Sequence, residues 1–288
     1  MRGKFMKMAG CAAFALLMCV GTPSVAKAAV KKIPAQKGYK TYAAKVDLNG
    51  DGKADSFKMT TTKDRNGYVN KITMTLNNKT VYSKSYKDSS FYNCYVTYAS
   101  MSKSREFIQI VGRGDNDYVE FNQIYAYNTQ TKKINCINSF NTTGCYQTEI
   151  VAADKNYVTI QNADQPSEVG WISWTIPYKY SNGKLVAATT STTTVKSLIA
   201  SNKKDKYSKY FAKNQFVTAK QLTFYNGAKP VYTVPKGKVI TLKKLSVSNG
   251  VIYLQFQYGK KVGWAHVNGK KYDIRKPWFE GVNARLVA

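Results

Sequence analysis

Short runs of alternating apolar and polar residues, each bounded by Asn, Gly, Asp or Ser, dominate the chain after residue 28. Alternation with a period of two is typical of β-strands, because successive side chains of a strand point to opposite faces. Tyr and Thr are abundant in these runs, and both favour the pleated, half-buried surface of a sheet. The clearest predicted strands are KITMTL (71–76), EFIQIV (106–111), FNQIYAY (121–127), YVTIQ (157–161) and WISWTIPYKY (171–180). We therefore predict an all-β protein.

Similar segments recur about 50 residues apart in the first two thirds of the chain. CYVT at Cys94 is repeated as CYQT at Cys145, 51 residues later. Intervals of 50 residues separate Phe57, Phe107 and Tyr157. Repeats of this length are typical of propeller blades and of other β-meander arrays, and chance similarity between Tyr- and Thr-rich strands is the alternative. We expect a β-repeat domain of about three units over 29–190, either propeller-like or a β-meander array, with a β-sandwich left open.

The composition changes towards the C-terminal third of the chain. A Thr/Ser-rich run (187–195) leads into a basic stretch (196–214) whose apolar residues indicate a short helix. We predict that 191–214 is a basic linker. Short alternating runs separated by Gly-Lys and Asn-Gly turns fill 215–288. They predict a separate β module of the size of a small SH3-like barrel.

The first 28 residues have the three parts of a secretory signal peptide. MRGKFMKM is basic, AGCAAFALLMCVG is apolar but too short to span a bilayer, and SVAKA offers small residues at Ala26 and Ala28 for cleavage. An N-terminal membrane anchor is the alternative. After cleavage we expect no transmembrane segment, because no later stretch of the sequence is apolar enough. The protein is therefore expected to be secreted, either extracellular or associated with the cell wall.

Three of the five cysteines lie beyond this segment, at Cys94, Cys136 and Cys145. An odd number leaves at least one thiol unpaired. A Cys136–Cys145 disulfide would close a short loop, whereas a Cys94–Cys145 disulfide would join matching strands of neighbouring repeats. Three reduced thiols in a strand-rich core are the third alternative.

The charge balance is strongly basic, with 44 Lys and Arg against 16 Asp and Glu, a formal net charge of +28. The predicted signal peptide holds 4 of the basic residues and none of the acidic ones, so the exported chain would carry +24. Residues 184–288 alone contain 20 basic and 3 acidic residues. Such charge on an exported protein favours an anionic partner, either peptidoglycan or teichoic acid, and export argues against nucleic acid. A lysine-rich surface that only maintains solubility is the alternative.

One acidic segment, DLNGDGKAD (47–55), has the spacing of a calcium-binding loop. Counted from Asp47, side-chain oxygens fall at positions 1, 3, 5 and 9, and Gly52 occupies the turn position 6. Position 12 is Lys58 instead of Glu and a predicted strand follows, so the segment is not an EF-hand. The candidate ligands are the side chains of Asp47, Asn49, Asp51 and Asp55 and the backbone carbonyl of Lys53. A polar turn without metal is the alternative.

A loop of this kind that leads directly into a strand resembles the calcium loops of FG-GAP/VCBS-type repeats. The resemblance implies a structural Ca²⁺ held by the five residues named above. The affinity would be on the order of 10⁻⁴–10⁻³ M, as in other extracellular modules. The resemblance covers this one motif, because the other two repeats lack the acidic residues.

Residues 215–267 resemble the bacterial SH3 (SH3b) domain. The similarity rests on VTAKQLTFYNGA, KGKVITL and GKKVGWAHV. It implies a small barrel that binds peptidoglycan or another wall polymer, with aromatic faces against sugars and lysines against acidic groups. The candidate ligand-binding residues are Tyr225, Tyr258, Trp264, Tyr272 and Trp278. For Trp264 a place in the barrel core, beside Phe224, Tyr253 and Phe256, is the stronger alternative.

The sequence contains no convincing catalytic constellation. The single histidine, His266, lies in the predicted C-terminal module, apart from the cysteines and without an orienting partner. Candidates for a pair of glycosidase carboxylates are Glu106, Asp115, Asp117, Glu120, Glu149 and Glu168. We expect a monomeric, non-catalytic binding protein of the cell surface or wall, in which the ligand of the repeat domain stays open. A carbohydrate-active hydrolase, and an adhesin or inhibitor that binds a host protein, are the alternatives.

Overall fold

The computed structural model describes residues 28–282 apart from 37, 39, 102–104, 116–118, 141–146, 167, 200–204, 249–250 and 266–274. Strands account for 63% of the structure and helices for 2%, which confirms the all-β prediction. Several residues singled out from the sequence lie outside the described residues: 1–27 of the predicted signal peptide, Asp117, Cys145, His266 and Tyr272.

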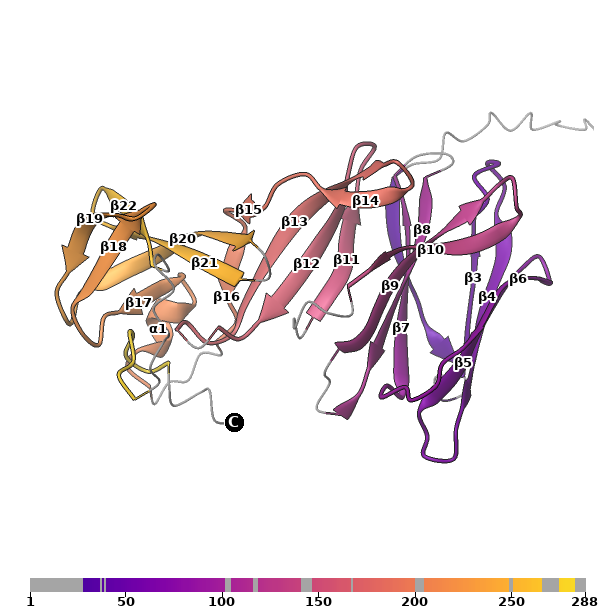
Figure 1. Cartoon of the computed structure of the whole chain (residues 1–288), viewed down its shortest axis with the longest axis horizontal. Helices are drawn as coiled ribbons and strands as arrows, with labels where there is room; N and C mark the ends of the chain where they lie inside the picture. Colours follow the sequence, from indigo (N-terminus) through magenta and orange to yellow (C-terminus); the bar gives the residue numbers. More distant parts are fainter. Residues whose placement is uncertain are drawn as a thin grey trace, which may run out of the picture.

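Three antiparallel meanders follow one another along the first part of the described chain (Figure 1). Sheet 1 contains, in order, β2 (Ala35–Gln36), β3 (Thr41–Val46), β4 (Asp55–Lys63), β5 (Val69–Leu76) and β6 (Lys79–Ser85). Sheet 2 contains β1 (Ala29–Ile33), β7 (Asn93–Ser100), β8 (Glu106–Arg113), β9 (Val119–Asn128) and β10 (Lys133–Ser139). Sheet 3 contains β11 (Gln147–Ala153), β12 (Val158–Asp164), β13 (Ile172–Ser181) and β14 (Lys184–Ala187). Strands β3, β7 and β11 begin at residues 41, 93 and 147, so equivalent strands lie 52 and 54 residues apart.

Local sequence explains where these strands turn. The hairpins β5–β6 and β13–β14 each have two central residues with positive φ, Asn77–Asn78 and Asn182–Gly183. Two such residues form the turn whose twist matches that of the paired strands, and Asn and Gly adopt it at the lowest cost. In β4 buried and more exposed residues alternate, as expected of a sheet with one covered face.

The segment between sheet 3 and the C-terminal sheet contains two short strands, one paired with each of these sheets. Sheet 4 contains β17 (Gln215–Val217), β18 (Leu222–Asn226), β19 (Lys229–Val234), β20 (Val239–Ser248), β21 (Val251–Tyr258) and β22 (Lys261–Trp264), with β15 (Ser191–Thr192) on its edge. Strand β16 (Val195–Ser197) pairs with β13, and a short helix, α1 (Ser208–Phe211), precedes β17. The segment predicted as a linker thus contributes strands to both sheets. Among the described residues none of the sheets closes into a barrel.

The sheets are stacked face to face along the long axis, and each interface has its own core (Figure 1). Met59 and Ile110 belong to the core between sheets 1 and 2, and Phe107 and Ile160 to the core between sheets 2 and 3. A third core joins sheets 3 and 4 through Trp174, Phe256 and neighbouring residues. Sheet 2 therefore has both faces covered, which explains why all eight residues of β8 are buried. Each unit buries its apolar residues against its neighbours, as in repeat proteins.

Candidate functional site

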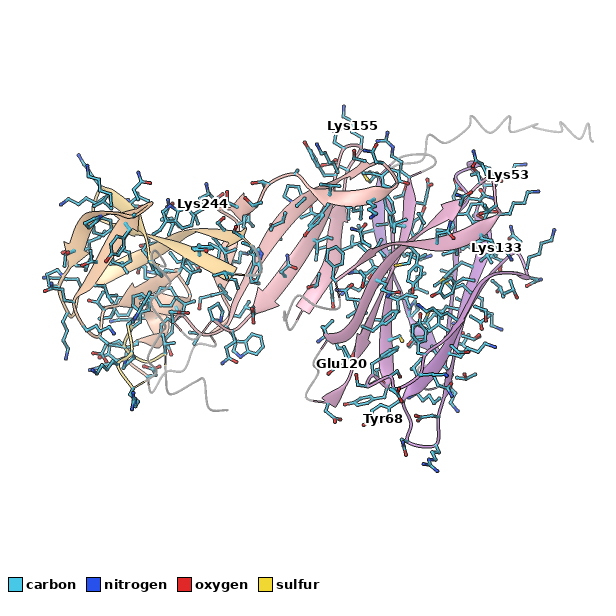
Figure 2. All side chains as sticks on the ribbon, in the orientation of Figure 1. Lys53, Tyr68, Glu120, Lys133, Lys155 and Lys244 are labelled. Carbon is cyan, nitrogen blue, oxygen red and sulfur yellow. The ribbon has the colours of Figure 1, made fainter. Side chains whose placement is uncertain are left out.

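The acidic segment forms a tight loop between β3 and β4. The Asp47 carboxylate accepts hydrogen bonds from the backbone N–H groups of Gly50 (2.9 Å) and Gly52 (2.8 Å). Both glycines have positive φ, 74° and 86°, which explains why side-chain-bearing residues are disfavoured there. Lys53 projects from this end of sheet 1 into solvent (Figure 2).

Asp55 closes the loop from its base. It is only 3% exposed, and its carboxylate accepts hydrogen bonds from the backbone N–H groups of Leu48 (3.1 Å) and Asn49 (3.2 Å). The Asn77 side chain, in the turn after β5, donates a further bond of 2.6 Å. A buried carboxylate needs such donors, because an unpaired charge in this position would be strongly destabilising.

The Asn49 side chain links the carboxylates of the loop. The Asn49 Nδ2 amide donates to Asp51 Oδ2 (3.2 Å) and to Asp55 Oδ1 (3.3 Å), and so lies between two carboxylates. The backbone N–H of Lys53 donates to Asp51 Oδ1. Within the described residues no group of three or more His, Cys, Asp or Glu side chains has the arrangement of a metal centre. The oxygen chemistry of the loop fits a hard divalent cation, and in this structure N–H donors occupy the same oxygens.

The outer face of sheet 4 carries a row of partly exposed side chains across four strands. The register pairs Lys244 with Gln255, Gln255 with Trp264, and Trp264 with Tyr225. Directly opposite residues of antiparallel strands share a face and lie close together, so Trp264 and Tyr225 are neighbours on this face. All four side chains are partly exposed, whereas Phe256, next in sequence to Gln255, is fully buried on the opposite face.

The other aromatic candidates of the C-terminal module have different positions. Phe224 and Phe256 are in the core as expected, whereas Tyr253 and Trp264, expected beside them, are partly exposed. Tyr258 and Trp278 are partly buried and pack against the core between sheets 3 and 4. The predicted ligand-binding residues therefore separate into an outward-facing pair, Tyr225 and Trp264, and a pair that supports packing.

Sheet 4 is also free of carboxylates. From Gln215 to Trp264 the sequence contains eight lysines and no Asp or Glu. Lys244 stands at one end of the outward-facing row and projects from the sheet (Figure 2). The positive charge of this sheet is therefore not neutralised from within it, and it is available to an anionic ligand.

The candidate glycosidase carboxylates are dispersed. Glu106 and Glu168 are buried, at 4% and 7% exposure, and Asp115 is exposed. Glu120 accepts a hydrogen bond from Ser90 Oγ at 3.1 Å, while Glu149 forms ion pairs with Lys32 and Arg113.

Of the candidate thiols, Cys94 is free and buried, and burial raises its pKa to about 12. Cys136 is free and exposed.

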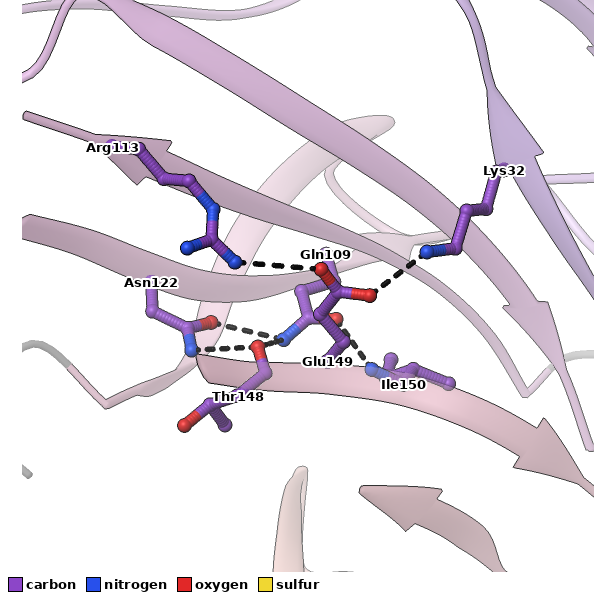
Figure 3. Close-up of polar contacts among 7 residues, drawn as sticks. All are labelled: Lys32, Gln109, Arg113, Asn122, Thr148, Glu149 and Ile150. Atoms are coloured by element: carbon purple, nitrogen blue, oxygen red, sulfur yellow. Dashed lines mark hydrogen bonds and ion pairs between the residues drawn. The ribbon is translucent and has the colours of Figure 1, made fainter. Parts of the chain in front are cut away.

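A network of amides, which sequence reasoning missed, joins sheets 2 and 3 (Figure 3). Gln109 is fully buried; its Nε2 donates to Thr148 O (3.1 Å), and its Oε1 accepts from Ile150 N (2.7 Å). Asn122, also fully buried, donates to Thr148 O and accepts from Gln109 Nε2. Thr148 and Ile150 lie on β11, the edge strand of sheet 3. The two amides therefore form hydrogen bonds with backbone N–H and C=O groups of the edge strand β11, which would otherwise have to pair with another strand.

Asp164, at the end of β12, gives a testable pH dependence. Burial raises the pKa of its carboxyl above the ordinary value, and the hydrogen bond from Gln165 N opposes this only in part. Because the pKa is raised in the folded state, ionisation of the Asp164 carboxyl lowers the stability of the fold as pH rises through that pKa. Well below about 3.9 the carboxyl is protonated in both the folded and the unfolded state, and this cost is absent. Asp164→Asn should therefore raise the thermal midpoint at pH 7 and lose this gain near pH 3. Asp154→Asn, in an exposed turn, is the control, and an equal gain at both pH values would contradict the assignment.

Comparison with known proteins adds no relative. No protein-family model matches the chain, and neither a curated protein nor a solved structure is significantly similar to it. Within the described residues no helix is long and apolar enough to cross a membrane. The resemblances to FG-GAP/VCBS repeats and to SH3b domains therefore stay predictions.

Proposed function

We propose that this chain is an exported, non-catalytic protein of the cell surface that binds a wall polymer through sheet 4. The observation that carries the proposal is the carboxylate-free sheet with its row of Lys244, Gln255, Trp264 and Tyr225. Aromatic faces stack on sugar rings and on apolar parts of a polymer, and lysines attract phosphate or carboxylate groups. Peptidoglycan with its attached anionic polymers offers both kinds of group.

The finer architecture belongs to the same proposal. Sheets 1 to 3 act as propeller-like repeats that present the binding module, and sheet 4 acts as an SH3b-like module. A structural Ca²⁺ at the loop Asp47–Asp55 stabilises sheet 1. The support is the donor set of hard oxygens, Asp47, Asn49, Asp51 and Asp55 with the carbonyl of Lys53, in a loop with glycines at the tight turns.

Co-sedimentation of the exported full-length chain with purified bacterial sacculi tests wall binding. Lys243→Glu/Lys244→Glu should weaken binding by about tenfold or more at low salt, because two attractive charges become repulsive. Lys133→Glu/Lys155→Glu makes the same change in net charge outside sheet 4 (Figure 2) and should change binding less than twofold. Equal losses in both pairs would show that only net charge matters and would remove the role of sheet 4.

The aromatic pair is tested separately from charge. Trp264→Ala/Tyr225→Ala should lower the binding that persists at high salt, because stacking is not screened as charge attraction is. Sacculi stripped of teichoic acid then identify the polymer. Loss of binding on stripping assigns the anionic polymer, whereas retained binding that depends on Trp264 and Tyr225 assigns peptidoglycan. Absence of binding to either preparation would overturn the proposed function.

A further inference from the structure

A cavity of about 420 Å³ lies where sheets 1, 2 and 3 converge. Strand β1 pairs with β7 as far as Ile33 opposite Val96, and the chain then crosses to sheet 1, where Ala35 pairs with Tyr42. The cavity opens at this crossing. Its walls come from the β1–β2 segment, from β3, β7 and β8, and from Glu149 on β11. Its size falls at the lower end of the range for small-molecule sites.

On one side of the cavity Glu149 forms ion pairs with two cations whose side chains differ in exposure (Figure 3). Glu149 Oε2 lies 2.8 Å from Lys32 Nζ, and Glu149 Oε1 lies 3.6 Å from Arg113 Nη2 on the opposite side. The Arg113 side chain is 8% exposed and is fixed in place, also lying over the Tyr95 ring. The Lys32 side chain is 72% exposed, so it can move away from Glu149 at little cost.

The rest of the cavity is mostly apolar. Ile33, Val96 and Val111 line it and are at most 3% exposed. Ile33, Val96 and the buried ring of Tyr42 lie on the side of sheet 1, whereas Val111 lies on the opposite face of sheet 2. Among the described lining residues Glu149 is the single carboxylate and Lys32 the single cation. A pair of carboxylates, as glycoside hydrolysis requires, is therefore not present in this lining.

We propose that this cavity binds a free amino acid with an apolar side chain. The ligand ammonium would take the Glu149 oxygen now held by Lys32, the ligand carboxylate would take the released Lys32 ammonium, and the side chain would contact the apolar part of the lining. A zwitterion leaves every charge paired. A simple anion would lie next to Glu149 unpaired, and a simple cation would displace Lys32 without replacing its partner, both at a cost.

Three compounds with the same six-carbon chain test the charge requirement: norleucine (2-aminohexanoate), hexanoate and hexylamine. Binding to the exported full-length chain is measured by isothermal titration calorimetry and by saturation-transfer NMR. Norleucine should bind about tenfold or more tighter than either of the others, as each new charge-assisted contact contributes. Equal binding of norleucine and hexanoate, or no binding of norleucine at about 10 mM, would overturn the proposal.

Substitutions locate the site. Lys32→Met and Glu149→Gln should each weaken norleucine binding by about tenfold. Lys31→Met is the matched control, because the Lys31 ammonium is directed to Lys45 O, outside the cavity lining, and it should leave binding unchanged. If Glu149→Gln lowers the thermal midpoint through Arg113, the exposed Lys32 variant decides, and unchanged binding in Lys32→Met would refute the site. None of these residues lies in sheet 4, so wall binding is tested independently.

Discussion

Gln109→Met should lower the free energy of unfolding by about 2–4 kcal/mol, although methionine matches glutamine in length and lacks only its amide. The Gln109 amide is the acceptor for Ile150 N and one of two donors to Thr148 O. After the substitution the buried Ile150 N–H has lost that acceptor, and no water reaches a fully buried site easily. The thermal midpoint should fall by roughly 5–15 °C for a chain of this size.

Gln255→Met is the matched control for this experiment. It makes the same chemical change on the partly exposed outer face of sheet 4, where solvent remains available to polar groups, and it should alter stability by less than about 0.5 kcal/mol. Equal midpoints for the two variants would show that the amide network between sheets 2 and 3 contributes nothing to folding. A loss confined to Gln109→Met would establish that this polar contact holds the repeats together.

The strands and their recurrence could be predicted from local pattern alone. Alternation in KITMTL and EFIQIV marks β5 and β8, and the aromatic residues at 57, 107 and 157 lie at equivalent places in or beside β4, β8 and β12. These signals depend only on the period of a strand and on turn residues such as Asn77 and Asn182. The face-to-face stack of the sheets depends on contacts between distant residues, which periodicity does not encode.

Gln109 illustrates why the interface between sheets 2 and 3 was missed. In EFIQIV it occupies a polar place among apolar residues, the pattern of a solvent-facing position. The structure covers that face with sheet 3, so Gln109 and Phe107 point into the same interface. A buried amide and an exposed amide look identical in a single sequence, because burial is decided by the neighbouring sheet.

The candidate sites also differ in whether their residues are close together in the sequence. The acidic loop is contiguous, so its residues could be identified from spacing, and the structure adds Asn77 as a partner of Asp55. Lys32 and Glu149, in contrast, are separated by 117 positions and meet only because β1 and β11 converge. No local motif joins them. The pairing of Tyr225 with Trp264 likewise depends on the register of β18 and β22.

Asp51→Ala should abolish the stabilisation of the protein by Ca²⁺ with little loss of stability in EDTA. At a dissociation constant of about 10⁻⁴ M, 10 mM Ca²⁺ would stabilise the wild type by about 2.7 kcal/mol, or roughly 5–10 °C. Asp51 is exposed, so its contribution without metal is confined to surface hydrogen bonds. Asp64→Ala removes a carboxylate from a comparable turn of sheet 1, where it accepts bonds from Asn66 N and Tyr68 N, and it should keep the full response.

Asp55→Ala separates the metal from the fold of the loop. The Asp55 carboxylate accepts bonds from Leu48 N, Asn49 N and the Asn77 amide, so its removal should cost about 2–4 kcal/mol in EDTA as well as in Ca²⁺. Melting curves of wild type and both variants, with EDTA and with 10 mM Ca²⁺, then give two independent differences. A Ca²⁺ response that survives Asp51→Ala would mean that the loop is a turn closed by Asp55 and that the ion, if it binds, does so elsewhere. A response lost in Asp51→Ala and kept in Asp64→Ala would assign the ion to the loop, with Asp55 required for its fold.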